Sequence, residues 1–226
     1  MKRIVQIELT NHCNRKCSYC GQSNMTRPKA YMELQVVERC IDVLLNLGQM
    51  TDVGLNHYGE SLLHPGFIFI LRMMNDKGIN PWLYTNGDSL SDHLIESISK
   101  LKLSTLVISA HIAKVKRMEL YRRCVEAGIN TFWQEDYTPN NLLSIANQVG
   151  EGCDSKNPIL EDPTNHCKFL RDQCAIVLSN GDLVPCCCDY DGKGVFGNIM
   201  DKDAINLNPK EFILCKQCPG HPTNIV

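Results

Sequence analysis

Alternation of short apolar stretches with longer segments of helical periodicity constrains the fold of this chain most strongly. The pattern repeats five times between residues 4 and 149. The expected strands cover residues 4–9, 52–57, 82–85, 106–110 and 131–136, and the expected helices cover residues 32–47, 65–77, 91–101, 114–127 and 141–149. Strict strand–helix alternation is typical of a parallel sheet covered by helices. The sequence therefore predicts an α/β fold for residues 1–150.

Residues that favour helix ends support these boundaries. Gly48, Gly78 and Gly128 directly follow three expected helices, where a left-handed residue is commonly needed. Ser91 and Pro65 stand where two helices are expected to begin.

The chain changes character after residue 150. Residues 175–178 and 183–185 are expected to pair as a hairpin, because Asn180-Gly181 between them is a strong signal for a tight turn. Eight of the thirteen cysteines lie beyond residue 150, in a segment with few apolar residues. We therefore expect a second, small cysteine-rich domain over residues 151–226, held together by metal rather than by a large core.

Composition limits the possible partners and compartment. The 23 Lys and Arg residues nearly balance the 25 Asp and Glu residues, so no excess charge favours nucleic acid or an anionic membrane. The longest apolar run, residues 67–71, is too short to cross a bilayer, and the N-terminus does not resemble a secretory signal. We expect a cytoplasmic protein in which the odd number of cysteines serves as metal ligands or catalysts rather than as disulfides.

The motif Cys13-x3-Cys17-x2-Cys20 directly follows the first expected strand. Three thiolates on one loop can hold three corners of a [4Fe–4S] cubane and leave the fourth iron open. The alternative is a zinc site in which His12 or a distant residue supplies the fourth ligand.

This spacing, its position after the first strand and the aromatic Tyr19 before the last cysteine resemble the radical S-adenosylmethionine (radical SAM) enzymes. The resemblance implies a partial (β/α) barrel of about five to six units. It also implies that S-adenosylmethionine binds the open iron through its amino and carboxylate groups and that its reductive cleavage yields a 5′-deoxyadenosyl radical. Tyr19 would then lie beside the adenine.

Other strand ends match the cofactor-binding positions of the same family. Tyr58-Gly59-Glu60 resembles its Gly-Gly-Glu loop, with tyrosine in place of the first glycine, and the resemblance implies that this loop receives the methionine ammonium. By the same resemblance, the polar residues at the ends of the next two strands bind the nucleoside or the methionine carboxylate; they are Thr85, Asn86, Asp88 and Ser109. Without the cysteine motif, these segments would be interpreted as ordinary turns.

A second set of cysteines resembles the twitch half of the SPASM/twitch extension found in this family. The resemblance implies an auxiliary [4Fe–4S] cluster, which makes two clusters in all, with four ligands: Cys167, Cys186, Cys215 and Cys218. Either Cys187 or Cys188 could replace Cys186, because the three are adjacent. A hairpin with a Cys-x2-Cys pair also describes a zinc ribbon, which remains the alternative.

Within the family, the combined motifs are most similar to aminocyclitol dehydrogenases. This similarity implies oxidation of a carbinol carbon of a sugar-like or aminocyclitol substrate to a ketone, with the auxiliary cluster as electron acceptor and an external one-electron reductant such as flavodoxin or ferredoxin. Candidate bases at strand ends are His111, Glu135 and Asp136.

Three other functions compete with this interpretation. A sugar epimerase would use a cysteine as hydrogen donor, with Cys187 as the named candidate beside Cys153, Cys174 and Cys188. A peptide-modifying maturase is a second alternative, although the first strand is expected to begin at about residue 4 and leaves no room before it for the peptide-recognition domain that such enzymes often carry. A non-catalytic zinc protein is the third. A ketone product separates the dehydrogenase from the epimerase, whose reaction is redox-neutral.

Overall fold

A computed structural model describes residues 1–17, 20–109, 113–133 and 168–210 of the chain. Strands and helices alternate through the described part of its first 133 residues, except that a single bridging residue, Gly54, stands between α1 and α2. The strands are β1 (Arg3–Ile7), β2 (Trp82–Thr85), β3 (Thr105–Ile108), β4 (Thr131–Trp133), β5 (Cys174–Val177), β6 (Asp182–Val184) and β7 (Gly197–Asn198). The helices of four or more residues are η1 (Gly21–Asn24), α1 (Leu34–Asn46), α2 (Phe67–Asp76), α3 (Asp92–Ser99), α4 (Lys114–Glu126) and α6 (Lys168–Arg171), and two shorter 3-10 turns are η2 (Ser61–Leu63) and η4 (Ala204–Asn206).

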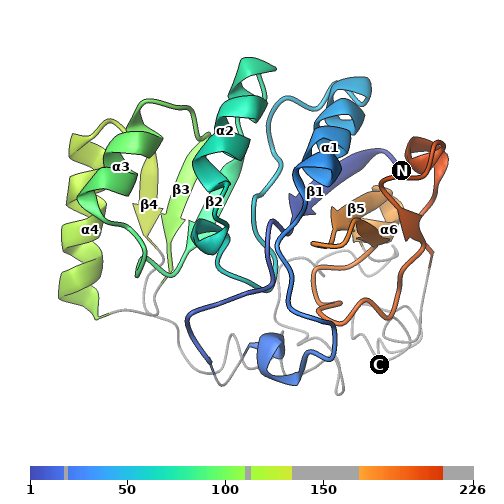
Figure 1. Ribbon diagram of the computed structural model, residues 1–226, viewed down its shortest axis with the longest axis horizontal. Coiled ribbons are helices and arrows are strands. Elements are labelled where there is room, and N and C mark those ends of the chain that lie inside the picture. The colour runs from blue at the N-terminus through green and yellow to red at the C-terminus, as the bar shows by residue number, and fades with distance from the viewer. Residues whose placement is uncertain (18–19, 110–112, 134–167, 211–226) are drawn as a thin grey trace.

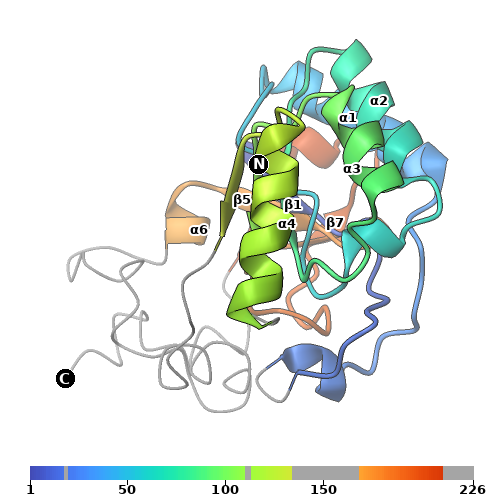
Figure 2. The same ribbon diagram turned by 90° about the vertical axis from the view of Figure 1, so that its left-hand side faces the viewer.

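Parallel pairing of β2, β3 and β4 confirms the predicted sheet, with Trp82 opposite Thr105 and Leu106 opposite Thr131. Helices α1 to α4 lie along one side of this curved sheet (Figures 1 and 2). The strands and these helices enclose a core in which Leu44, Ile70 and Leu83 have no exposed surface. Burying a side chain of this size contributes about 1.5–3 kcal/mol.

The strand predicted over residues 52–57 is much shorter than expected. Gly54 alone bridges β1 to β2: its N–H donates to Val5 O over 2.9 Å, and its carbonyl accepts from Ile7 N over 2.8 Å. Asp52, with φ of 64°, turns the chain just before it. A Cβ on Gly54 would overlap the Trp82 ring, so Gly54 can lie this close to β2 only because it has no side chain.

The predicted hairpin is confirmed and extends the sheet on the other side of β1. β5 pairs with β1 in parallel, from Arg3 opposite Cys174 to Ile7 opposite Val177, and β6 returns antiparallel to β5. Gly181, with φ of 88°, forms the turn. The domain boundary predicted at residues 150 and 151 lies outside the described residues and stays a prediction.

Most of the predicted helix ends are also confirmed. The Ser91 hydroxyl accepts from Leu94 N over 3.2 Å at the start of α3. Gly48, Gly78 and Gly128 all have positive φ after α1, α2 and α4. Helix α2 begins at Phe67 rather than at residue 65, because the 3-10 turn η2 and Gly66 precede it. The helix predicted over residues 141–149 lies outside the described residues.

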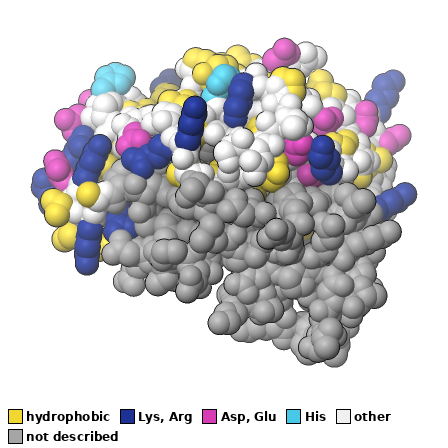
Figure 3. Space-filling model, turned by 90° about the horizontal axis from the view of Figure 1, so that it is seen from below, with side chains coloured by type: hydrophobic (Ala, Val, Ile, Leu, Met, Phe, Trp, Pro, Cys, Tyr) yellow, Lys and Arg dark blue, Asp and Glu magenta, His cyan; other side chains and the backbone are white. Residues whose placement is uncertain are grey.

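Within the described ranges, no helix is both long and apolar enough to span a membrane. Seen from the end where the strands finish, the described surface carries charges of both signs (Figure 3). This mixture agrees with the nearly balanced composition of the chain.

Candidate active site

A cavity lies at the carboxyl ends of the strands, where the polar ends of parallel strands converge. All three cysteines of the first motif line it, together with residues that follow Leu55, β2 and β3. The lining residues are Cys13, Arg15, Cys17, Cys20, Gln22, Asn56, His57, Tyr58, Gly59, Glu60, Tyr84, Thr85, Asn86 and Ser109. The predicted cysteine loop and most of the predicted cofactor-binding residues are therefore brought to one place.

Backbone amides approach two of the three thiols. Burial raises the pKa of Cys13 and of Cys20. The backbone N–H of Arg15 opposes this rise in the pKa of Cys13, and the backbone N–H of Gln22 opposes it in the pKa of Cys20. Such donors favour the thiolate, which is the form that binds metals. No three His, Cys, Asp or Glu side chains of the described ranges meet around a single ion, but a cubane binds each thiolate at a different iron.

Gly59 explains how the Tyr58-Gly59-Glu60 loop is held against the cysteine loop. A Cβ at this position would overlap the carbonyl oxygen of Thr10 and approach the backbone of Asn11. The next amide, Glu60 N, donates to His12 O over 2.8 Å. Glycine is therefore required because two backbones meet directly before Cys13.

The Glu60 carboxylate joins this loop to the end of β2. Its Oε2 accepts from Asn86 N over 2.8 Å, and its Oε1 accepts from the Thr85 hydroxyl over 3.0 Å. Leu62 N, at 3.3 Å, is a further donor to Oε1. Burial raises the pKa of Glu60, and these bonds oppose the rise. Glu60, Thr85 and Asn86 thus form one bonded group at the cavity wall.

Asp88 is not among the residues that line the cavity, and its predicted cofactor-binding role stays a prediction. Its carboxylate binds Arg15 at two points, Nε to Oδ2 over 2.6 Å and NH2 to Oδ1 over 2.7 Å. The bond from Arg15 lowers the pKa of Asp88. Asn14 Nδ2 also donates to this carboxylate over 3.2 Å. In this structure Asp88 therefore holds the cysteine loop in place.

Tyr58, which replaces the family's first glycine, is a buried wall residue. Its ring packs edge-on against His57 at 4.6 Å and against Tyr190 at 5.6 Å between ring centres. Burial raises its pKa, so the phenol stays protonated. Ser109, also buried, donates its N–H to Thr85 O over 2.9 Å at the end of β3.

Several cavity residues were not predicted from the sequence: Arg15, Gln22, Asn56, His57 and Tyr84. Asn56 Oδ1 and His57 Nε2 are buried and make no hydrogen bond within the described part of the chain. Burial lowers the pKa of His57, which favours the neutral ring. Their position at the end of an expected strand was the available signal.

The second cysteine group is described only at its central triplet. Cys188 N donates to Cys186 Sγ over 3.3 Å. Cys13 and Cys20 likewise interact with the backbone N–H of the residue two positions later. Cys187 packs against the apolar cluster of Ile176, Leu178 and Val184, and its role as a hydrogen donor stays a prediction. The remaining candidates lie outside the described residues: Tyr19, His111, Glu135, Asp136, Cys153, Cys167, Cys215 and Cys218.

A cysteine-lined cavity at the carboxyl ends of parallel strands defines an α/β protein built to hold a metal cluster beside a small-molecule site. The chain belongs to the radical SAM superfamily, whose family model matches residues 7–134, more than half of its length. The resemblance of the cysteine motif to this family is thereby confirmed.

Known relatives agree with this assignment. The S-adenosyl-L-methionine-dependent 2-deoxy-scyllo-inosamine dehydrogenase of Niallia circulans is 24% identical over 208 residues, which cover 90% of this chain and 81% of that protein. The crystal structure of BtrN in complex with AdoMet and 2-DOIA matches with a TM-score of 0.69 at 24% identity, over 89% of this chain and 79% of that one. Streptococcus suis SuiB bound to its precursor peptide SuiA matches with a TM-score of 0.66 at 15% identity, over 91% and 64%. At these identities the structures show a shared fold.

The residues present suit the cofactors that the superfamily implies, a [4Fe–4S] cluster and S-adenosylmethionine. Three thiols line one cavity, and backbone N–H groups act on two of them. The contact at Gly59 keeps the neighbouring loop at the cavity wall. Cys13, Cys17 and Cys20 would hold the cluster, and the group formed by Glu60, Thr85 and Asn86 would lie beside the nucleoside.

Proposed function

We propose that this protein is a radical SAM oxidoreductase that oxidises a carbinol carbon of a sugar-like or aminocyclitol substrate to a ketone. The observation that carries the proposal is the cavity in which the three cysteines meet the polar ends of β2 and β3. Similarity to an aminocyclitol dehydrogenase over 81% of that enzyme's length supports the substrate class.

Residues of the cavity divide into those that bind the cofactor and those that shape the substrate site. Cys13, Cys17 and Cys20 would bind three irons, and the family resemblance implies that Tyr19 would lie beside the adenine. Tyr58 closes the cavity on the side of Tyr190 and excludes water there, because its ring is buried between two other rings. Bound S-adenosylmethionine, on reduction, supplies a 5′-deoxyadenosyl radical that removes one hydrogen atom from the substrate carbon.

Completing the oxidation requires the loss of one proton and one further electron from the substrate. The hydroxyl proton passes to a base, for which His111, Glu135 and Asp136 remain candidates. Cys167, Cys186, Cys215 and Cys218 would hold an auxiliary [4Fe–4S] cluster, which would accept this electron. Support for Cys186 comes from its Sγ, which accepts the backbone N–H of Cys188. An external one-electron carrier, flavodoxin or ferredoxin, supplies the electron that starts the reaction.

Metal content tests the two-cluster arrangement. Anaerobically reconstituted protein is expected to contain about eight irons and eight sulfides. Replacing Cys13, Cys17 and Cys20 together by Ala should remove about half of the iron and all nucleoside cleavage. Replacing Cys186 by Ala should remove the other half and leave nucleoside cleavage. Zinc at full occupancy in the anaerobic protein would contradict the proposal.

A further inference from the structure

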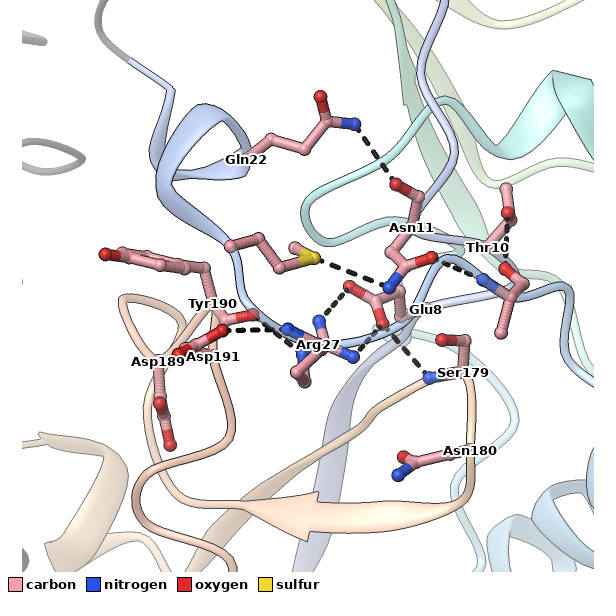
Figure 4. A network of polar contacts seen from close by, with 12 residues as sticks. Glu8, Thr10, Asn11, Gln22, Arg27, Ser179, Asn180, Asp189, Tyr190 and Asp191 are labelled. Carbon is pink, nitrogen blue, oxygen red and sulfur yellow. Dashed lines mark hydrogen bonds and ion pairs between the residues drawn. The ribbon is translucent and has the colours of Figure 1, made fainter.

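A buried ion pair joins segments that are far apart in the sequence. Glu8 has no exposed surface, and both of its oxygens accept from Arg27: Oε2 from NH1 and Oε1 from NH2, each over 3.0 Å (Figure 4). Ser179 N is a third donor, to Oε2 over 3.0 Å. Burial alone would raise the pKa of Glu8, but the charge and hydrogen bonds of Arg27, together with the backbone N–H of Ser179, favour the carboxylate and the pKa is lowered. Glu8 is therefore ionised and fully bonded.

These residues flank both cysteine groups. Glu8 lies between β1 and Cys13, Arg27 follows Cys20, and Ser179 lies in the hairpin turn before Cys186. The pair thus connects the two ends of the first cysteine loop to each other and to the hairpin that leads into the second cysteine group.

A second set of contacts holds the chain that follows the triplet. Arg27 Nε donates to Tyr190 O over 2.8 Å, and Arg27 N donates to the Asp191 carboxylate over 3.1 Å (Figure 4). The same carboxylate accepts from Thr26 N over 2.6 Å. The Tyr190 ring also packs so closely on Gly21 that a Cβ there would overlap it. The ion pair therefore reaches the chain on both sides of the segment Cys186–Cys188, through Glu8 at Ser179 and through Arg27 at Tyr190 and Asp191.

Such a pair is poorly explained by stability alone. Desolvation offsets much of the attraction between buried charges, and apolar residues of similar volume often stabilise a protein equally well. What a two-point ion pair adds is direction, because both partners are fixed in orientation. Five hydrogen bonds made by Arg27 and Glu8 constrain the two cysteine-bearing segments relative to each other.

We propose that Glu8 and Arg27 are positioning residues whose ion pair sets the separation between the Cys13–Cys20 loop and the Cys186–Cys188 segment. The inference rests on the proposed function, since this separation decides whether the electron released by the substrate reaches the auxiliary site. Its test nevertheless includes a distance that can be measured without turnover.

The variant that tests the proposal replaces both partners, Glu8→Gln with Arg27→Met. The new glutamine side chain still offers an acceptor to Ser179 N, and the new methionine side chain fills the space of the arginine stem, so no charge is left buried and unpaired. Arg27→Lys is the second variant: it keeps the charge but cannot bind both oxygens and Tyr190 O together. The matched control is Asp92→Asn with Arg123→Met, which removes an ion pair between α3 and α4, outside the residues that line the cavity.

Spin labels on genetically encoded keto amino acids at exposed Ser23 and Val195 report the separation by pulsed electron paramagnetic resonance. We expect one narrow distance distribution in the parent and in the control pair. The double variant should broaden it about twofold or more, and Arg27→Lys should give an intermediate width. In the full enzyme, ketone formed per 5′-deoxyadenosine should fall about tenfold in the double variant, because a displacement of about 1 Å between reacting groups can cost about a hundredfold in rate.

A double variant with the parental distance distribution and product ratio would overturn the proposal and leave the pair a stabilising contact only. If the double variant does not fold, Arg27→Lys decides by the same two measurements. Absence of ketone from the parent enzyme would instead contradict the proposed function, and the distance distribution would still decide whether the pair positions the two segments.

Discussion

Arg15 and Asp88 form a two-point ion pair that joins the first cysteine loop to the turn three residues after the end of β2. Both side chains are about one quarter exposed, at 25% and 26%, so the pair contributes at most about 1 kcal/mol to stability. Its importance lies in where it holds the loop, because Arg15 stands between Cys13 and Cys17.

Asp88→Asn should therefore affect the cluster more than the fold. We expect a thermal midpoint close to that of the parent, but faster loss of iron from the reconstituted protein in the presence of a chelator, by about two- to fivefold for a contact of this strength. Glu96→Gln, which removes the exposed Glu96–Lys100 ion pair on α3, is the control and should lose iron at the parental rate.

Gly59→Ala tests the close approach of the two loops. The added Cβ would overlap the Thr10 carbonyl oxygen, and neither backbone can move without displacing Cys13. We expect a loss of about 1–3 kcal/mol in the free energy of unfolding, measured with denaturant. Gly66→Ala is the control: its Cβ would meet only side chains, the His64 ring at 3.3 Å and Leu34 at 3.9 Å, and should cost far less. Equal effects of the two substitutions would contradict the role of Gly59.

Sequence periodicity predicted the alternation of strands and helices because each element buries one apolar face, which the chain repeats locally. It overestimated the strand at residues 52–57, since the turn at Asp52 and the Trp82 ring against Gly54 depend on three-dimensional contacts. The ion pairs of Arg15 and Arg27 could not be predicted, because their partners are far away in the sequence. One signal was present: Glu8 is a charged residue between the apolar Ile7 and Leu9, both buried.

Glu60→Gln should disturb the group at the end of β2. Both Glu60 oxygens accept hydrogen bonds, so a side-chain amide would present its NH2 to one of these donors. We expect S-adenosylmethionine to bind at least about tenfold more weakly, measured by equilibrium titration, because Asn86 N loses a charged acceptor or Thr85 turns away. Thr85→Val removes one donor only and should weaken binding less. Unchanged affinity in Glu60→Gln would show that this group does not shape the nucleoside site.

The lowered pKa of Asp191 predicts how the stability of the fold depends on pH. Burial would raise its pKa, but hydrogen bonds from Thr26, Lys193 and Arg27 outweigh this and lower it to about 2, from an ordinary value of 3.8. A carboxylate with a lowered pKa in the folded state stabilises the fold above its unfolded pKa, and this stabilisation is lost as the pH falls through the folded value. Asp191→Asn should thus be less stable than the parent at pH 7.

The difference in unfolding free energy between parent and Asp191→Asn should stay constant down to about pH 4 and shrink between about pH 4 and pH 2. Denaturant titrations at a series of pH values measure it. A difference that does not change with pH would show that the Asp191 charge makes no net contribution to stability.

The central claim, oxidation at a carbinol carbon started by cleavage of S-adenosylmethionine at Cys13, Cys17 and Cys20, is tested most directly by following one deuterium atom. Anaerobic enzyme with reductant, S-adenosylmethionine and an aminocyclitol substrate deuterated at its carbinol carbons should yield 5′-deoxyadenosine that carries one deuterium and an equal amount of ketone. Both products should be absent from the triple Ala variant of these cysteines. Unlabelled 5′-deoxyadenosine, or a labelled one accompanied by an epimer instead of a ketone, would contradict the account.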